Sequence, residues 1–286
     1  MNSNPKGHRL AGIIPISGKQ NSFDFPWPDY LQPLREGFLA VERSVYECAF
    51  AGCDSIWVVC NDDVAPLVKS RIGDYVMNPK YFEVNDFVKR RDFHQKWIPV
   101  FYVPISQKDR ERRDSLGWSV LHGALTAFIM SDKISKWVVP SKYFVSFPQG
   151  IYDTSTISSY RTAIRGDESF FLSYKGETAR EGKYLAFTFF PEDWPKFKWH
   201  MKEQCTGGSR EIPFEERWSS RHFTLDKIFN LDVISRDKVV EIDEYYDLDS
   251  WESVREYYSS DLKIPRPSKQ FMKPYNFTNK GIEDEN

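Results

Sequence analysis

Small and charged residues follow an apolar segment near the start of the chain. Residues 10–16 are almost entirely apolar, and Ser17, Gly18, Lys19 and Gln20 come directly after them. Small residues and a flexible glycine leave backbone N–H groups accessible, and the lysine adds a cation, which together suit the phosphates of a nucleotide. The Walker spacing of glycine, lysine and serine or threonine is absent. The loop is therefore either a phosphate site or an ordinary turn between a strand and a helix.

Other candidate residues for chemistry are less specific. In residues 104–115 Lys and Arg alternate with Asp and Glu, so this segment either steers phosphates or forms a solvated charged loop. His122, His200 and His222 lack the spacing of metal ligands, and no Gly-x-Ser-x-Gly motif supports a Ser–His–Asp triad. The loop at Ser17 therefore remains the leading feature.

The elements that would position this loop alternate between strands and helices. Periodicity and turn residues predict strands over 10–16, 55–60, 98–103 and 136–147, the last interrupted at Pro140, and helices over 38–51, 116–129 and 249–260. We expect an acidic residue to cap the last helix. Strands that alternate with helices are typical of a parallel sheet with right-handed crossovers. The expected fold is a doubly wound, mostly parallel, Rossmann-like α/β sheet.

Composition narrows the class of protein. The chain has 286 residues, a net charge of −2, 41% hydrophobic residues and 16% aromatic residues. That charge does not favour a nucleic-acid-binding protein, and no apolar run is long enough to span a membrane. The start of the chain lacks the apolar core of a signal peptide, and the cysteines show no zinc or disulfide pattern. We expect a cytoplasmic protein with structural thiols.

The order of the motifs resembles that of the sugar-nucleotide pyrophosphorylases, which are nucleotidyltransferases of glycosyltransferase-A-like fold. The resemblance rests on Ser17–Ser22, Pro28–Leu34, Ser115–Ala124, Tyr143–Asp153 and Tyr245–Val254, and it covers residues 9–153 and 240–258. It implies that Ser17, Gly18, Lys19 and Gln20 bind the nucleotide, with Lys19 as the catalytic cation. A looser resemblance is to nucleotidyltransferase-like proteins of tailed phages, which implies a host cytoplasm.

The third motif concerns the base of the nucleotide. In the family, a glycine at this strand-to-helix turn lets the base and ribose approach the backbone, and Gly117 matches it. Trp118 replaces a small residue. The resemblance implies that both residues bind the nucleotide, and an aromatic ring is able to stack on a base or to fill the pocket. Packing at the start of a helix accounts for the same residues.

Two positions depart from the family pattern. Asp29 stands where the family has a lysine that meets a phosphate, and a carboxylate repels phosphate. Pro148 and Gln149 stand where the family has a glycine and the aspartate that holds Mg²⁺. The resemblance then leaves Asp153 and Asp247 as the candidates for Mg²⁺, which prefers oxygen ligands.

The chain is expected to form one nucleotidyltransferase-like domain over residues 1–260. Its nucleotide-binding half would span about 9–153 and its acceptor half about 154–260. Residues 261–286 are rich in proline, lysine and asparagine and end in acidic residues, which is typical of an extended or disordered tail.

The resemblance implies transfer of a nucleotidyl group from a nucleoside triphosphate to a sugar phosphate or a similar phosphorylated acceptor, with release of pyrophosphate. One alternative is a glycosyltransferase that uses a nucleotide sugar. Another is an inactive protein that still binds a nucleotide, which the residues at 29, 148 and 149 favour. We expect small-molecule partners, and neither a membrane nor a nucleic acid.

Overall fold

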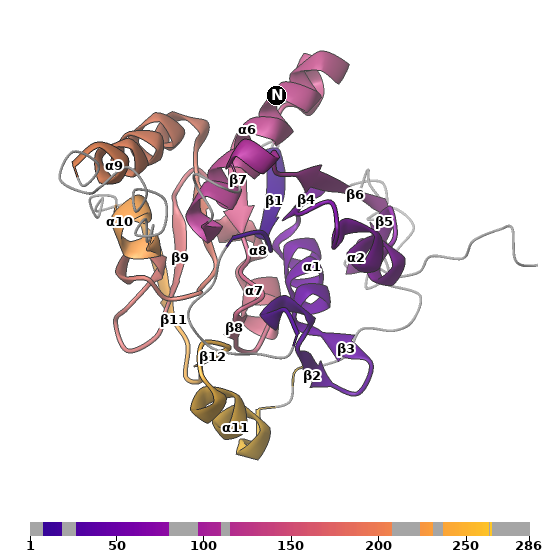
Figure 1. Ribbon diagram of the computed structural model, residues 1–286, viewed down its shortest axis with the longest axis vertical. Coiled ribbons are helices and arrows are strands. Elements are labelled where there is room, and N and C mark those ends of the chain that lie inside the picture. The colour runs from indigo at the N-terminus through magenta and orange to yellow at the C-terminus, as the bar shows by residue number, and fades with distance from the viewer. Residues whose placement is uncertain are drawn as a thin grey trace, which may run out of the picture.

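A mixed eight-stranded sheet forms the centre of the computed structural model, which describes residues 8–18, 27–79, 97–109, 115–207, 224–230, 237–262 and 264 (Figure 1). The strands lie in the order β11-β9-β10-β7-β1-β4-β6-β5. Their bounds are β1 Leu10–Pro15, β4 Ser55–Cys60, β5 Tyr75–Met77, β6 Trp97–Pro104, β7 Lys142–Val145, β9 Phe170–Ser173, β10 Phe187–Phe189 and β11 Lys238–Glu241.

The central strands β7, β1, β4 and β6 are parallel. Ile13 of β1 lies opposite Trp57 of β4 on one side and Val145 of β7 on the other. β10 is antiparallel to β7 and β9, β11 is parallel to β9, and β5 is antiparallel to β6. The expected doubly wound, mostly parallel α/β sheet is confirmed, and the carboxyl ends of its parallel strands share one edge.

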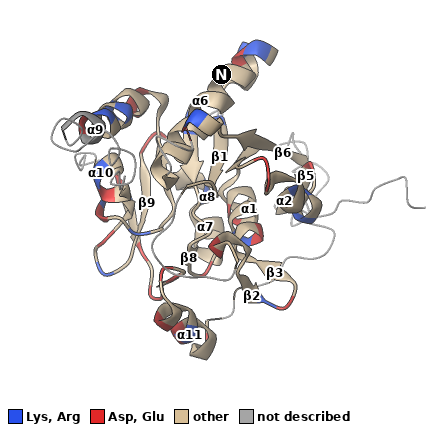
Figure 2. Cartoon of the chain, viewed as in Figure 1, with Lys and Arg blue, Asp and Glu red and all other residues tan. Residues whose placement is uncertain are grey.

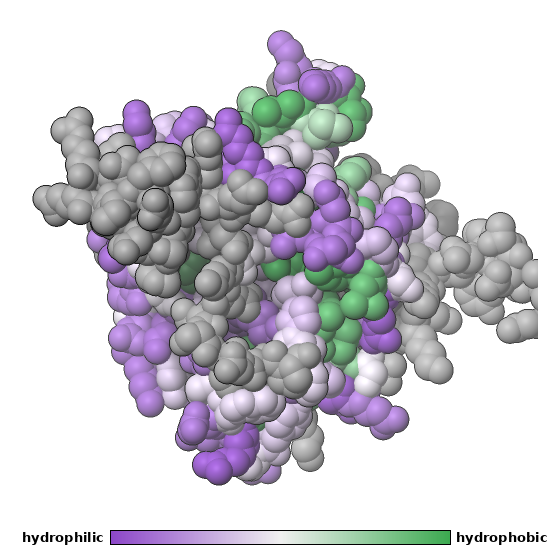
Figure 3. All heavy atoms as spheres, in the orientation of Figure 1, coloured by the Kyte–Doolittle hydropathy of each residue, from purple (hydrophilic) through white to green (hydrophobic). Residues whose placement is uncertain are grey.

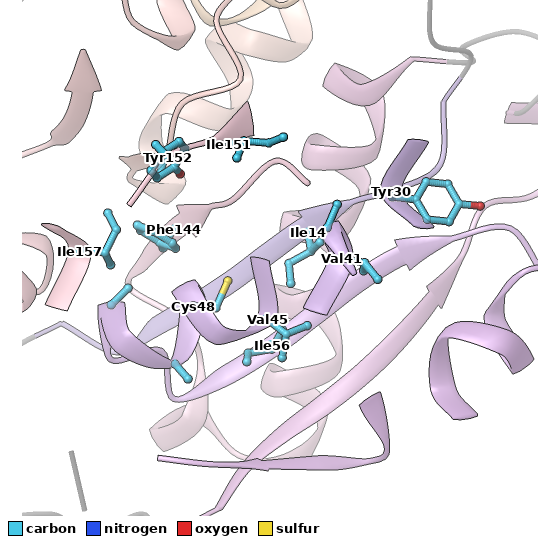
Figure 4. Close-up of a cluster of buried hydrophobic side chains, with 14 of the residues drawn as sticks. Ile14, Tyr30, Val41, Val45, Cys48, Ile56, Phe144, Ile151, Tyr152 and Ile157 are labelled. Carbon is cyan, nitrogen blue, oxygen red and sulfur yellow. The ribbon is translucent and has the colours of Figure 1, made fainter. Parts of the chain in front are cut away.

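Helices cover both faces of the sheet because neighbouring strand residues point to opposite sides. Ile14 packs with the buried face of α1 (Ala40–Ala51), as Figure 4 shows for Val45 and Cys48. Ile13 belongs to a second core cluster under α6 (Leu116–Ile134). A Cβ on Gly123 of α6 would lie 3.0 Å from Cγ2 of Ile13, so this helix lies directly on the strand.

Shorter elements surround this core. The helices are α2 Ala65–Ile72, α7 Ser155–Ser159, α8 Arg161–Ile164, α9 Trp194–Gly207, α10 Leu225–Phe229 and α11 Trp251–Ser259. The 3-10 turns are η1 Asp29–Leu31, η2 Lys136–Val138, η3 Ala179–Glu181 and η4 Pro191–Asp193. Two small antiparallel sheets pair β2 (Pro33–Arg35) with β3 (Phe38–Leu39), and β8 (Gly150–Ile151) with β12 (Tyr246–Asp247).

Two local predictions are wrong. Residues 136–138 form the turn η2 instead of a strand, because the Ser135 side chain accepts the N–H of Trp137 and the Trp137 side chain is 81% exposed. Helix α11 has Ser250 as its N-cap, not an acidic residue, since the Ser250 hydroxyl accepts the N–H of Ser253 at 3.1 Å.

The far end of α6 projects from the body of the molecule and carries exposed apolar residues, including Ile134 (Figure 3). Among the described residues, no helix is long and apolar enough to cross a membrane.

Cys48, Cys53 and Cys60 are buried and free, as expected of structural thiols.

Candidate functional site

The first candidate residue, Ser17, lies where β1 ends and is tied to two other elements. Its N–H donates to the carbonyl of Val59 at 3.0 Å, and its hydroxyl donates to Oδ1 of Asn61 at 2.6 Å. Its carbonyl accepts the hydroxyl of Ser119 on α6. Ser17 therefore fixes the start of the loop against β4 and α6.

Gly18 continues the loop directly against the start of α6. Its φ is +139°, a conformation that favours glycine, and a Cβ there would lie 2.5 Å from the carbonyl carbon of Ser115. The structure thus brings the first and third sequence motifs into contact. Lys19 and Gln20 lie outside the described residues.

The first turn of α6 carries Gly117 and Trp118. Ser115 caps the helix by accepting the N–H of Trp118 at 3.2 Å. A Cβ on Gly117 would lie 2.2 Å from Cδ1 of Ile228, so this glycine permits close packing against α10. Trp118 is 8% exposed and belongs to the core under α6. These contacts match the packing alternative, and a role with the base remains a proposal.

A turn over residues 146–149 connects β7 to β8 and meets the fifth motif. The N–H of Leu248 donates to the carbonyl of Gln149 at 3.0 Å, and Gly150 pairs with Asp247 across β8 and β12. A Cβ on Gly150 would lie 1.9 Å from the carbonyl oxygen of Tyr184. The fourth and fifth motifs, about 100 residues apart in the sequence, therefore lie side by side.

A buried ionic cluster holds this turn from the α1 side. Nη1 of Arg43 lies 2.7 Å from Oε2 of Glu47, and Nη2 donates to the carbonyl of Phe147 at 2.6 Å. The hydroxyls of Ser146 and Tyr152 both donate to the Glu47 carboxylate. We call Arg43, Glu47, Ser146 and Tyr152 the closed cluster. Its members neutralise one another and fix the backbone on both sides of Gln149.

A second group of polar side chains includes Gln149 of that turn. Burial raises the pKa of Asp29, which is 8% exposed, to about 7. The N–H of Tyr30 and the amide of Gln149 lower this pKa, and the charge of Asp249 raises it. Burial also raises the pKa of Tyr184, and the nearby carboxylate of Asp249 adds to this rise. We call Asp29, Gln149 and Asp249 the open cluster.

Gln149 distinguishes the open cluster from ordinary packing. Its side chain is fully buried, and it lies close enough to Asp29 to influence that carboxyl. Apart from this interaction with Asp29, neither its amide nitrogen nor its amide oxygen has a hydrogen-bond partner among the described residues. Buried polar atoms in native proteins have partners in the great majority of cases. The open cluster therefore has polar groups left over for a ligand.

The two carboxylates that the resemblance assigns to Mg²⁺ each accept a hydrogen bond from a backbone N–H nearby in the sequence. Asp153 is exposed, and its Oδ1 accepts the N–H of Ser155 at 2.9 Å beside α7. Oδ1 of Asp247 accepts the N–H of Asp249 at 3.2 Å. In the part of the chain that the structure describes, no group of three or more His, Cys, Asp or Glu is placed to hold a metal ion. Mg²⁺ binding by Asp153 and Asp247 remains a prediction.

Sequence reasoning did not identify the open cluster as a unit. It singled out Asp29 and Gln149 separately, as departures from a family pattern, and placed Asp249 only at the start of a helix. The signal available in the sequence was that Asp29 and Gln149 both depart from the same family pattern. To join them into one cluster, the turn after the first strand and the turn after β7 would have had to be recognised as neighbours in space.

Comparisons with known proteins show which solved structures share the fold of this chain. No family model and no curated protein matches the chain. A solved structure from Bacillus anthracis, assigned as a glucose-1-phosphate thymidylyltransferase and bound to sucrose, is similar with 11% identity and a TM-score of 0.52; the match covers 90% of this chain and 98% of that one. At this identity the likeness shows the fold alone.

Two other solved structures match less well. Rv0371c from Mycobacterium tuberculosis H37Rv has 14% identity, a TM-score of 0.46, and coverage of 89% of this chain and 100% of its own. A UDP-glucose pyrophosphorylase complexed with UDP-glucose has 12% identity, a TM-score of 0.45, and coverage of 88% and 97%.

Proposed function

We propose that this protein is a nucleotidyltransferase that acts on a nucleoside triphosphate and a sugar phosphate or similar phosphorylated acceptor. The observation that carries the proposal is the meeting of separate motifs at one edge of the sheet. Gly18 lies against the start of α6, and the turn at Gln149 lies against the segment at Leu248. Ligands of open α/β sheets bind beyond the carboxyl ends of the strands, which is this edge.

In this proposal an acceptor phosphate oxygen attacks the α-phosphorus of the triphosphate. The new P–O bond forms as the bond to the β-phosphate oxygen breaks, and pyrophosphate leaves with the bonding electron pair. Ser17, whose own N–H is used by Val59, anchors the loop; the backbone N–H groups from Gly18 to Gln20 and the ammonium of Lys19 hold the phosphates, while Gly117 and Trp118 border the base. Catalysis rests on positioning and charge neutralisation. Mg²⁺, the expected cofactor, supplies part of that neutralisation when bound.

Nucleotide binding gives the first test. The four nucleoside triphosphates and a set of nucleotide sugars are added to the full-length chain with and without MgCl₂, and thermal melting is followed. We expect one class of ligand to raise the melting temperature and Lys19→Ala to weaken its binding about tenfold or more, which is roughly 1.4 kcal/mol. Lys133→Ala, at an exposed position on α6, is the matched control. Absence of any nucleotide-induced shift contradicts the proposal.

The products separate the proposed reaction from its alternatives. Pyrophosphate release with a sugar phosphate supports nucleotidyl transfer. Release of a nucleoside diphosphate from a nucleotide sugar supports a glycosyltransferase. Nucleotide binding that is insensitive to MgCl₂, without turnover of either kind of donor, supports an inactive nucleotide-binding protein.

A further inference from the structure

We propose that the projecting end of α6, together with the turn η2, forms the contact between two copies of this chain. The large apolar side chains exposed there, which we call the apolar tip, are Phe128, Ile129, Met130, Ile134, Trp137 and Val138. The start of α6 lies against Gly18, and 19 helical residues span about 28 Å, so the tip is remote from the proposed nucleotide site. Assembly through the tip is therefore independent of the reaction proposed above.

The apolar tip begins where α6 leaves the core. Ala127 is the last residue of α6 in the core cluster under that helix, and the helix continues to Ile134. Seven further residues add about 10 Å of helix. Figure 1 shows this part of α6 extending away from the sheet. Short helical segments without packing partners are marginal in water, so a partner that packs against these turns would stabilise them.

The fold of one chain does not account for the apolar side chains of the tip. Towards the end of α6, Ala127 and Ser131 belong to the buried stripe at helical spacing. Phe128, Ile129 and Met130 are three successive residues, which cover about 200° of the helix surface, and each is between 41% and 44% exposed. The outer face of a surface helix is normally polar. A contiguous exposed apolar patch indicates contact with a protein or a membrane.

The area of the apolar tip suffices for a stable pair of chains. Ile134 is 70% exposed and Trp137 is 81% exposed, which makes them the two most exposed large apolar side chains among the described residues. A large side chain that is about half exposed presents on the order of 100 Å². Six of them on each of two chains therefore bring about 1,200 Å² to a contact, which reaches the range of stable interfaces. A tryptophan is a typical anchor at the centre of such a contact.

The charges beside the apolar tip favour a second copy of the chain as its partner. Figure 2 shows acidic and basic residues together at the far end of α6. Asp132 and Lys136 are exposed, and neither forms an ion pair with another described residue. Ile134 lies midway between them in the sequence, so a two-fold axis beside Ile134 places Asp132 of one chain opposite Lys136 of the other, twice. An anionic membrane surface would offer the Asp132 carboxylate no partner.

The oligomeric state of the full-length chain tests this contact. Sedimentation velocity at micromolar concentrations should give a mass twice the 33.6 kDa of one chain. Ile134→Glu combined with Trp137→Ser should weaken dimerisation about a hundredfold or more, because charge enters the centre of the contact. Leu67→Glu, at a side chain of α2 that is 51% exposed, is the matched control and should leave the mass unchanged. Circular dichroism and thermal melting confirm that each variant is folded.

Charge reversal distinguishes a second copy from any other partner. In a pair of identical chains, Asp132→Lys places a lysine opposite Lys136, and Lys136→Asp places an aspartate opposite Asp132. Each variant alone should therefore dimerise at least tenfold more weakly than the parent. An equimolar mixture of the two variants restores both ion pairs, and it should dimerise as the parent does.

Three results overturn the inference. They are a folded parent that stays monomeric at micromolar concentrations, an Ile134→Glu and Trp137→Ser double variant that dimerises as the parent does, and a mixture of the charge variants that dimerises no better than either variant alone. Flotation with vesicles of phosphatidylglycerol and phosphatidylcholine tests the other occupant. A monomeric parent that floats with these vesicles, while the double variant does not, assigns the apolar tip to a membrane surface instead.

Discussion

The two polar clusters both involve the turn over residues 146–149, and they differ in how their charges are matched. In the closed cluster, Arg43 and Glu47 pair at 2.7 Å and share hydroxyl and carbonyl partners; among its polar atoms, Nε of Arg43 lacks a hydrogen bond in the described structure. In the open cluster, the charge of Asp249 raises the pKa of buried Asp29, whose carboxyl forms no ion pair within the described residues, and the Gln149 amide has no hydrogen-bond partner there besides Asp29. The difference distinguishes polar side chains that pair with one another and stabilise the fold from polar side chains that are available to a ligand.

The closed cluster has a local origin that the open cluster lacks. Arg43 and Glu47 are four residues apart on α1, so one helix face presents both charges. Asp29, Gln149 and Asp249 come from three turns, where side chains are held by the backbone rather than by one another. Turns at a sheet edge are where binding residues are concentrated.

The largest effect is expected from breaking the closed cluster. Arg43→Ala leaves the carboxylate of Glu47 buried without its cation, and the free energy of unfolding should fall by about 3–5 kcal/mol. Urea denaturation measures this loss. The double variant Arg43→Met with Glu47→Leu removes both charges and should lose less than the single variant. A loss under about 1 kcal/mol in Arg43→Ala would mean that the ion pair does not hold the turn.

In metal-free protein, removal of the Asp29 charge from the open cluster should raise the free energy of unfolding at high pH, whereas removal of Arg43 from the closed cluster lowers it. Because the pKa of Asp29 rises from 3.8 to about 7 on folding, its contribution to stability is fully present below pH 3.8 and is lost as the pH rises through 7. Asp29→Asn should therefore be more stable than the parent at pH 8, by on the order of 2–4 kcal/mol, and nearly equal to it near pH 4. Urea denaturation in EDTA across this pH range checks the prediction, and equal stabilities at pH 8 would contradict it.

A smaller effect is expected outside both clusters, at Gly18. An alanine there combines an unfavourable φ of +139° with a Cβ 2.5 Å from the backbone of Ser115, and should cost about 1–3 kcal/mol. Gly176→Ala is the control: its φ is +78°, and a Cβ there meets nothing within 4 Å. Thermal melting and nucleotide titration distinguish the two. Nucleotide binding should weaken only in Gly18→Ala; equal binding in both variants would exclude Gly18 from the site.

The smallest expected effect concerns the contact that supports Asp29 from α11. Nε2 of Gln32 donates to the hydroxyl of Tyr258 at 2.8 Å, and that hydroxyl donates to Pro33. Tyr258→Phe removes both hydrogen bonds and should lower the free energy of unfolding by about 0.5–1.5 kcal/mol. Tyr75→Phe, at a side chain that is 53% exposed, is the control. An equal change in Tyr258→Phe and Tyr75→Phe would contradict this role of the contact.

Much of the fold could be predicted from short-range patterns. The buried run over residues 55–60 is strand β4, and the helical spacing that ends before Gly52 is α1, since each pattern reflects burial on one or two faces. The segment 136–138 was predicted as a strand because it is apolar. Its exposure was set by the projecting end of α6, which no local pattern reveals.

The candidate site was predictable only in pieces. The sequence indicated the loop at Ser17 and Gly18, and the start of α6 at Gly117, as separate motifs. Their contact depends on the parallel order of the strands, which brings their carboxyl ends to one edge. Lys19 remains a prediction.

By itself, the sequence determined the parallel α/β architecture, because alternating apolar strands and amphipathic helices bury their apolar faces in few other ways. It also placed an acid at position 29 and an amide at 149. Only the tertiary structure decided that these two groups are buried near Asp249, while Arg43 is already neutralised by Glu47. The physical reason is that solvation and charge pairing depend on neighbours in space, and Asp29, Gln149 and Asp249 lie 100 or more residues apart in the sequence.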